Sequence, residues 1–326
     1  MHHLCTYFDR NFLIKGLTLY RSLRSHAPDR FELWVLCLDD FTYDILKQLD
    51  LKDLHPISMH EFEAGDTELL QAKTNRSRVE YFFTCTPSLP LFVLRQNPGI
   101  QTVTYLDADL FFFSSIEDIF RAFEPYSILI IPHRYPARLK RLEDYGIFNV
   151  GLLVFRNDPS GIECLEWWRE RCLEWCYDRV ESGRFADQKY LDDWPQRFSR
   201  VVVLHNKGAN LAPWNVSQYQ ITEENGHVKI DGEQLIFYHF HRLKQFNRRV
   251  CDPGLAEYQS DPLSRRVRTG IYLPYLRALE DTRRWLRSKS LDIDPGYVRL
   301  QPGRYRVRSL LGGAARSLLR GQLIIS

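Results

Sequence analysis

Two aspartates at the end of an apolar segment are the residues best suited to chemistry in this sequence. They lie in the run YLDADLFFF as Asp107 and Asp109, separated by Ala108. Acidic side chains are rare within such runs, because a buried unpaired charge is costly. Two carboxylates there can hold Mg²⁺ or Mn²⁺ against a diphosphate. The alternative is a turn in which one aspartate caps the backbone and the other is solvated.

A histidine pair further along the chain offers a third ligand for such a metal. His239 and His241 lie in the segment FYHFH, at the end of a predicted strand. A neutral imidazole suits Mn²⁺, and strand alternation points only one of the two toward a given face. The alternative is a histidine that is hydrogen-bonded in the core. Lys244 follows closely and can neutralise a phosphate, or be an ordinary surface lysine.

Polar residues also interrupt two other apolar segments. In FNVGLLVFRN, Asn149 and Gly151 begin a strand of core residues, which suggests that a ligand approaches the backbone closely. In FADQKYLDDW, Asp187 and Gln188 open a short helix where they can meet sugar hydroxyls, or where the aspartate caps the helix. The loop HNKGANLAPWN is a reasonable wall for a sugar or an acceptor.

The elements that must position these residues alternate between strands and helices. This alternation predicts the α/β class, with ligands at the carboxyl ends of the strands. A helix is expected over residues 43–49 with Thr42 as its cap, and a helical stretch over 76–95, interrupted near Pro87 and Pro90. The predicted strands cover residues 4–8, 31–38, 54–59, 103–106, 127–131, 148–155, 201–204 and 235–239.

Composition limits the classes of protein to consider. The chain has 326 residues, 44% hydrophobic and 26% charged, which is typical of a globular protein. No apolar run is long enough for a membrane span, and the first residues lack a signal-peptide pattern, so we expect a cytoplasmic protein. Four of the seven cysteines lie in apolar segments that suit buried thiols, namely Cys5, Cys37, Cys85 and Cys164, and neither a disulfide framework nor a zinc site is indicated.

Charge is distributed unevenly along the chain. Residues 261–326 hold 14 Lys and Arg against 5 Asp and Glu, whereas the rest of the chain is net acidic. We therefore expect a catalytic domain over 1–255 and a basic helical C-terminal extension over 256–326. The extension can contact an anionic membrane as a peripheral attachment, or pack on the domain. Nucleic acid is not expected as a partner, because the folded body is acidic.

Taken together, these segments resemble glycosyltransferases with the GT-A fold, a Rossmann-like mixed sheet flanked by helices. The resemblance is to the family 8 type, which includes glycogenin-like and lipopolysaccharide sugar transferases. It covers about residues 3–245 and depends on the order and spacing of TYFDRNF, YLDADL, FNVGLLVF, DQKYL, PWN and FYHFH.

The resemblance implies a role for each of these motifs. Asp107 and Asp109 would bind Mn²⁺ or Mg²⁺ together with His239, and Ala108 would lie against the nucleotide sugar. Thr6, Asp9 and Asn11 would lie near the base and ribose, while Gly151 and Lys244 would contact the rest of the donor. The catalytic residues around the donor sugar would be Asn149, Asp187 and Gln188.

The implied reaction is a retaining transfer of a hexose from a nucleoside diphosphate sugar, UDP-sugar favoured, in polysaccharide biosynthesis. The acceptor would be a glycan or a lipid-linked molecule. HFHRLKQF departs from the family pattern, since it lacks a glycine and the Pro-Trp that follows the family's lysine. The arginine that the family carries on the helix before its D-x-D motif is not clearly matched, because the nearest arginines upstream of the segment EYFFTCTP are Arg76 and Arg78. The alternatives are a sugar nucleotidyltransferase, although its glycine-rich N-terminal loop is missing, and a non-enzymatic sugar-binding protein.

Overall fold

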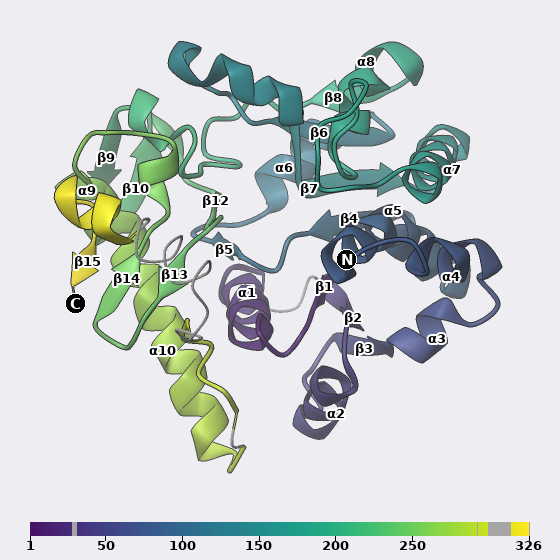
Figure 1. Ribbon diagram of the computed structural model, residues 1–326, viewed down its shortest axis with the longest axis horizontal. Coiled ribbons are helices and arrows are strands. Elements are labelled where there is room, and N and C mark those ends of the chain that lie inside the picture. Colours follow the sequence, from purple (N-terminus) through teal and green to yellow (C-terminus); the bar gives the residue numbers. More distant parts are fainter. Residues whose placement is uncertain (28–30, 292, 299–313, 326) are drawn as a thin grey trace. The chain divides into compact units, whose positions relative to one another are not determined.

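The computed structural model describes residues 1–27, 31–291, 293–298 and 314–325 (Figure 1). The chain divides into two compact units. The first unit comprises Met1–Arg10, Arg24–Ala108 and Ser115–His205, and the second comprises Asn11–Leu23, Asp109–Ser114 and Asn206–Ser326. The expected boundary near residue 255 falls inside the second unit, and the division at that point remains a prediction.

The first unit is built on a seven-stranded mixed sheet of order β3-β2-β1-β4-β7-β6-β8. Strands β3, β2, β1 and β4 are parallel, β7 is antiparallel to both β4 and β6, and β8 is parallel to β6. The expected α/β class with a mixed sheet is confirmed. The strands are β1 (His2–Phe8), β2 (Phe31–Cys37), β3 (Leu54–Ser58), β4 (Thr102–Leu106), β6 (Ile128–Pro132), β7 (Phe148–Arg156) and β8 (Val201–Val203).

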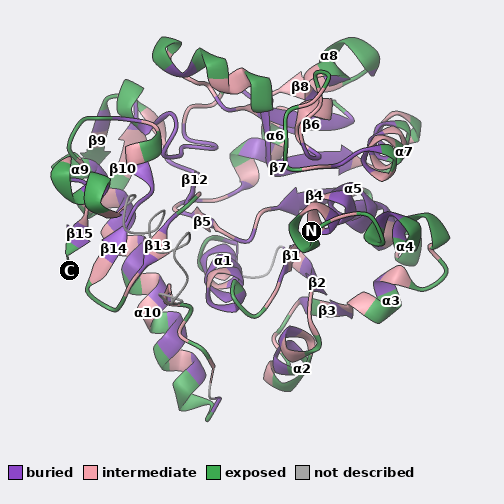
Figure 2. Cartoon of the chain, in the orientation of Figure 1, coloured by how far each residue is buried: buried purple, intermediate pink, exposed green. Residues whose placement is uncertain are grey.

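Helices cover this sheet and bury its central strands. Figure 2 shows β7 in the buried colour along most of its length, and eight of its nine residues are buried. Such a near-continuous apolar strand is expected where both faces are covered. The helices are α2 (Asp40–Leu49), α3 (Met59–Glu63), α4 (Thr67–Lys73), α5 (Arg78–Gln96), α6 (Glu117–Phe123), α7 (Pro159–Glu174) and α8 (Trp194–Arg197), with 3₁₀ helices η1 (Ala137–Tyr145) and η2 (Lys189–Asp193). Helix α1 (Leu13–His26) begins in the second unit.

Two local predictions are wrong. The cap of α2 is Asp39, whose side chain accepts a hydrogen bond from the Thr42 N–H at 2.8 Å, because a carboxylate that precedes the helix reaches its free N–H groups. Helix α5 also continues through Pro87 and Pro90. A proline inside a helix costs about 3 kcal/mol, but each fully buried apolar side chain contributes about 1.5–3 kcal/mol. Several such side chains lie on α5, including Leu89, Leu91 and Val93.

The second unit consists of small sheets and one long helix. Strand β5 (Leu110–Phe112) pairs antiparallel with β12 (Phe237–His239). The long helix α10 (Leu273–Ser288) has a buried stripe and an exposed outer side (Figure 2). The other elements are β9 (Ile221–Glu224), β10 (His227–Ile230), β11 (Glu233–Gln234), β13 (Lys244–Gln245), β14 (Val250–Asp252), β15 (Ile324–Ile325), α9 (Arg265–Val267), the π-helix η5 (Arg268–Tyr272) and the 3₁₀ helices η3 (Val216–Gln218) and η4 (Leu255–Glu257).

The seven cysteines are free and buried, and the expected burial of Cys5, Cys37, Cys85 and Cys164 is confirmed. Over the described ranges, no helix is both long and apolar enough to cross a membrane. Of the basic tail, residues 299–313, with Arg299, Arg304, Arg306 and Arg308, lie outside the described residues.

Candidate active site

Asp107 lies in the first unit, directly after β4. Its N–H donates to the carbonyl oxygen of Gly151 on β7 at 2.9 Å. The Tyr105 hydroxyl donates to Oδ1 of Asp107, also at 2.9 Å. Burial and the neighbouring Asp107 raise the pKa of Tyr105, so this hydroxyl keeps its proton. The main chain of β7 and the phenol of Tyr105 therefore fix the carboxylate at the carboxyl end of β4.

An amide network lies on the neighbouring strand of the same unit. Asn149 is buried on β7, and its Oδ1 accepts a hydrogen bond from the Gly151 N–H at 3.1 Å. Its Nδ2 donates to Gln188 Oε1 at 3.2 Å and lies 3.3 Å from His133 Nε2. The Gln188 Nε2 donates to the carbonyl oxygen of Tyr145 at 2.9 Å. The structure thus brings Asn149, Gly151 and Gln188 together.

Asp187 is an acid in an apolar setting. It is 5% exposed, and Trp168 Nε1 donates to its main-chain oxygen at 2.8 Å. Burial, with a further contribution from the charge of Asp107, raises the pKa of Asp187 to about 7. A carboxyl group with such a pKa can hold or release a proton near neutral pH.

Asp109 and His239 meet in the second unit, where β5 pairs with β12. The His239 Nε2 lies 3.1 Å from Asp109 Oδ1, and the Phe240 N–H donates to the Asp109 main-chain oxygen at 3.0 Å. Burial alone would raise the pKa of Asp109, but His239 and Lys15 hold it well below its usual range. Asp109 is therefore an ionised, partly buried carboxylate with an imidazole beside it.

A cavity of about 410 Å³ lies against Asp109 in the second unit. Asn11, Lys15, His241 and Lys244 are among its lining residues. Burial, with smaller contributions from neighbouring charges, lowers the pKa of His241 to about 3, so this imidazole is neutral at pH 7.

The remaining predicted nucleotide-binding residues are not all in one unit. Thr6 is fully buried in β1 of the first unit. Asp9, also in the first unit, accepts a hydrogen bond from Arg78 Nη2 at 3.0 Å. Asn11 lies in the second unit, on the wall of the cavity.

Sequence reasoning missed His133, Lys15 and Arg283. His133 directly follows β6, and its position after a predicted strand was a usable signal, because strand ends form ligand crevices. Lys15 is a lone cation in the apolar helix segment LIKGLTLY, which was a weaker signal. Nothing in the sequence around Arg283 distinguishes it from the other arginines of α10.

The chain is similar to two proteins of Bacillus subtilis (strain 168), both described as uncharacterized. It is 32% identical to YfnD over 311 residues, which cover 91% of this chain and 94% of YfnD. It is 34% identical to YfnF over 244 residues, which cover 72% of this chain and 80% of YfnF. No protein-family model matches the chain.

Among solved structures, the apo form of the glycosyltransferase GlyE of Streptococcus pneumoniae TIGR4 is similar to this chain, with a TM-score of 0.50 and 14% sequence identity. The similarity covers 89% of this chain and 64% of the GlyE chain. The fold is therefore of the glycosyltransferase type, as the motifs imply. Membership of family 8 in particular remains a prediction.

Proposed function

The chain belongs to the same family as YfnD and YfnF of Bacillus subtilis, and we propose that it is a metal-dependent glycosyltransferase. It moves a sugar, in our proposal a hexose, from a nucleoside diphosphate sugar to a glycan or lipid-linked acceptor. A UDP-sugar is the favoured donor and polysaccharide biosynthesis the favoured process.

The observation that carries this proposal is the pair formed by Asp109 and His239. Their side chains lie 3.1 Å apart, and Asp107 precedes Asp109 by two residues on the same segment after β4. An ionised carboxylate and an imidazole placed together suit a divalent cation. The glycosyltransferase fold adds support, because it makes the end of β4 a reasonable place for the donor.

The donor set fits Mn²⁺ or Mg²⁺, with Asp107, Asp109 and His239 as the residues that would hold the cation. When bound, the cation supplies a Lewis acid that stabilises negative charge on the leaving diphosphate. The protein prepares the site through the Tyr105 hydroxyl, which orients Asp107, and through His239, which keeps Asp109 ionised.

The sugar, in this proposal, lies against the amide network of the first unit. Asn149 and Gln188 present amide groups that can hydrogen-bond sugar hydroxyls. Asp187 is suited to hold or move a proton near pH 7, because its pKa is raised to about 7. We favour retention of configuration, with Asp187 or Gln188 facing the sugar.

Donor hydrolysis in the absence of acceptor tests the proposal. The protein is incubated with Mn²⁺ and a panel of UDP-, GDP- and dTDP-sugars, and nucleotide release is measured. We expect slow turnover of one donor, loss of turnover with EDTA, and a loss of at least about 100-fold in Asp109→Asn, which removes a negative ligand oxygen. Asp44→Asn, an exposed aspartate on α2, is the matched control and should behave as wild type.

A parallel reaction with nucleoside triphosphates and sugar 1-phosphates separates the alternatives. Pyrophosphate release in that reaction would replace our proposal with a sugar nucleotidyltransferase. Sugar binding that needs no metal and produces no turnover would replace it with a non-enzymatic sugar-binding protein.

We also propose a cytoplasmic location with peripheral membrane contact through the C-terminal tail. In the described part of the tail, Ser317 donates to Asp252 Oδ1 at 2.7 Å and Arg316 pairs with Glu257 at 2.9 Å. Leu318 and Leu319 are 62% and 86% exposed. Exposed leucines beside arginines suit an anionic bilayer surface.

A further inference from the structure

The 410 Å³ cavity of the second unit carries a surplus of positive charge. Among its lining residues, one is acidic, Asp109. The cationic lining residues number four: Lys15, Arg242, Lys244 and Arg283. A cavity with this balance attracts an anion.

Within the part of the chain that the structure describes, two of these cations form no hydrogen bond or ion pair. Arg242 already pairs with Glu257 at 3.5 Å. The ammonium groups of Lys15 and Lys244 form neither a hydrogen bond nor an ion pair with any described residue. The Lys15 ammonium lies 4.3 Å from the centre of the Phe12 ring, and burial lowers its pKa although Asp109 partly offsets this. Asp109 attracts this ammonium group but forms no ion pair with it, so the group remains available to a ligand.

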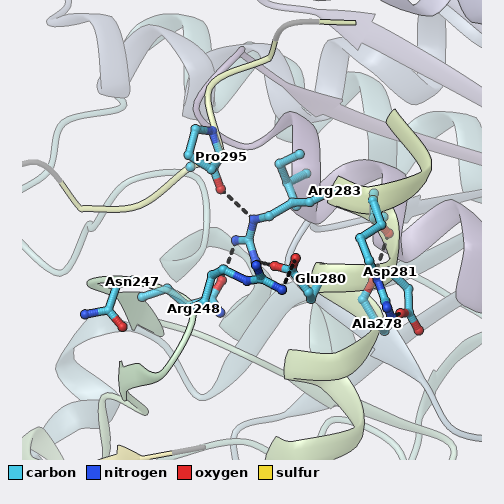
Figure 3. Close-up of polar contacts among 12 residues, drawn as sticks. Asn247, Arg248, Ala278, Glu280, Asp281, Arg283 and Pro295 are labelled. Atoms are coloured by element: carbon cyan, nitrogen blue, oxygen red, sulfur yellow. Dashed lines mark hydrogen bonds and ion pairs between the residues drawn. The ribbon is translucent and has the colours of Figure 1, made fainter. Parts of the chain in front are cut away.

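Arg283 is a buried guanidinium from α10. Its side chain is 4% exposed, its Nε donates to the carbonyl oxygen of Pro295 at 2.8 Å, and its Nη2 donates to Gln245 Oε1 at 2.5 Å (Figure 3). The remaining nitrogen, Nη1, has no hydrogen-bond partner within the described ranges and lies 3.7 Å from Glu280 Oε2. Buried guanidinium N–H groups are seldom left without an acceptor.

Glu280 does not neutralise Arg283 fully, because it is shared. Figure 3 shows Glu280 between Arg283 and Arg248. Oε1 of Glu280 pairs with Arg248 at 3.2 Å and with Arg287 at 3.1 Å. One carboxylate therefore faces three guanidinium groups, and the positive charge at this wall of the cavity remains in excess.

We infer that this cavity binds a diphosphate, and that Lys15 of α1 and Arg283 of α10 contact it beside Lys244. A cavity of this volume falls within the range of about 300–1,000 Å³ common for small ligands. Lys15 and Lys244 act as point charges, and Arg283 also shapes the wall by holding Pro295 and Gln245. The inference deepens the proposed function, on which it rests, because a diphosphate is the leaving part of the donor.

Calorimetric titration with inorganic pyrophosphate tests the inference in the presence of EDTA, so that binding depends on the cations of the protein alone. UDP, UMP and uridine are titrated in parallel to separate diphosphate binding from base binding. We expect wild type to bind pyrophosphate and UDP, and Lys15→Met to weaken pyrophosphate by about tenfold or more, since bonds to charged groups are strong. Added salt should weaken binding further.

Two variants of α10 complete the test. Arg283→Met should weaken pyrophosphate at least as much as Lys15→Met, and thermal unfolding verifies that it is folded. Arg284→Met removes a charge from the same helix at an exposed position that neither lines the cavity nor pairs with Glu280, and should bind within about twofold of wild type. If Arg283→Met does not fold, Lys15→Met alone decides the result.

The outcomes distinguish this inference from the proposed function. Wild type that does not bind pyrophosphate without metal, or Lys15→Met that binds like wild type, overturns the inference even where Mn²⁺-dependent donor hydrolysis is observed. Metal-free pyrophosphate binding that is lost in Lys15→Met supports the inference even where no donor is hydrolysed, and the proposed function then fails instead.

Discussion

Two acids, Asp187 in the first unit and Asp109 in the second, are held in opposite states by their surroundings. Asp109 stays ionised because His239 and Lys15 compensate its charge, although burial acts against it. For Asp187, a hydrogen bond with Thr86 offsets only part of the effect of burial, so burial and the charge of Asp107 raise its pKa to about 7. One fold thus provides a carboxylate suited to a cation and a carboxyl group suited to a proton.

The two histidines of FYHFH should differ in their effect on metal binding. We expect His239→Ala to weaken Mn²⁺ by about 10–100-fold, as loss of a ligand or its support does, because its Nε2 contacts Asp109. His241→Ala should change the affinity by less than about threefold, since the ring lines the cavity and packs edge-on against Trp214. Mn²⁺ titration measures both, and the reverse order would make His241 the ligand.

Asp187 should make the stability of the metal-free protein depend on pH. Its folded pKa of about 7 lies above the ordinary 3.8, so folding binds a proton between these values and stability falls as pH rises through this window. Below pH 4 the group has no effect, and above pH 7 the full destabilisation is present. Asp187→Asn has no carboxyl group to titrate, so this contribution to the pH dependence should be absent from the variant.

The measurement is urea unfolding in EDTA at pH 5 and pH 8. The gain in unfolding free energy from Asp187→Asn should be larger at pH 8 by roughly 3 kcal/mol, at about 1.4 kcal/mol per pH unit. Asp44→Asn serves as the exposed control, with the same difference from wild type at both pH values. A pH-independent effect of Asp187→Asn would show that the carboxyl group titrates normally.

At the scale of elements, short strands place His239 beside Asp109. Strand β12 has three residues, and its position depends on β5 on one side and on residues 206–211 on the other. The Gly208 carbonyl oxygen accepts hydrogen bonds from Ile236 and Phe237, and the His239 N–H donates to the Leu211 carbonyl at 2.8 Å. The loop that follows β8 therefore positions β12, the strand that carries His239.

Gly208→Ala should disturb the loop that positions β12. A Cβ at Gly208 would lie 1.9 Å from the Gln234 carbonyl oxygen, so backbone must move. We expect a loss of about 1–3 kcal/mol in unfolding free energy and weaker Mn²⁺ binding, measured by urea unfolding and metal titration. Gly99→Ala, where a Cβ meets open space, should stay within about 0.5 kcal/mol of wild type. Equal stability of the two variants would contradict this role of Gly208.

At the scale of the whole molecule, the described part of the C-terminal tail has some side chains that hydrogen-bond to the second unit and others that are exposed. Gln322 donates to the Asp261 carbonyl at 2.7 Å, and Arg320 donates to the Ala256 carbonyl at the same distance. Strand β15 adds to β14. The described tail therefore packs on the second unit, while Leu318 and Leu319 remain exposed. Both expectations for the tail can thus hold for different side chains.

Membrane contact by these leucines is tested in the full chain. Wild type should co-sediment with anionic vesicles but not with neutral ones, and the double variant Leu318→Glu, Leu319→Glu should lose most of this binding, because it removes apolar area and adds repulsion. Leu70→Glu, at a leucine that is 41% exposed on α4, is the control. Equal sedimentation of wild type and the double variant would exclude this surface as the contact.

Much of the fold could be predicted because its signals are local. The strands around Leu4, Val103 and Leu153 are rich in apolar, aromatic and β-branched residues, and such runs indicate strands whatever surrounds them. The short strands β5 and β13 could not be predicted, because two or three residues carry no periodic pattern and form through pairing with distant segments. The continuity of α5 through two prolines was also beyond local rules.

By itself, the sequence determined the α/β class and the candidate metal ligands, since an acid pair after an apolar strand and a histidine at a strand end are unusual as residue types. Only the tertiary structure decided that Asp109 is the carboxylate beside His239, that Asp187 is an acid with a pKa near 7, and that Lys15 and Arg283 share a cavity. The reason is physical, because Lys15 and Arg283 lie far apart in the chain and pKa values depend on burial and neighbouring charges. A sequence pattern shows neither which remote residues meet nor how deeply a side chain is buried.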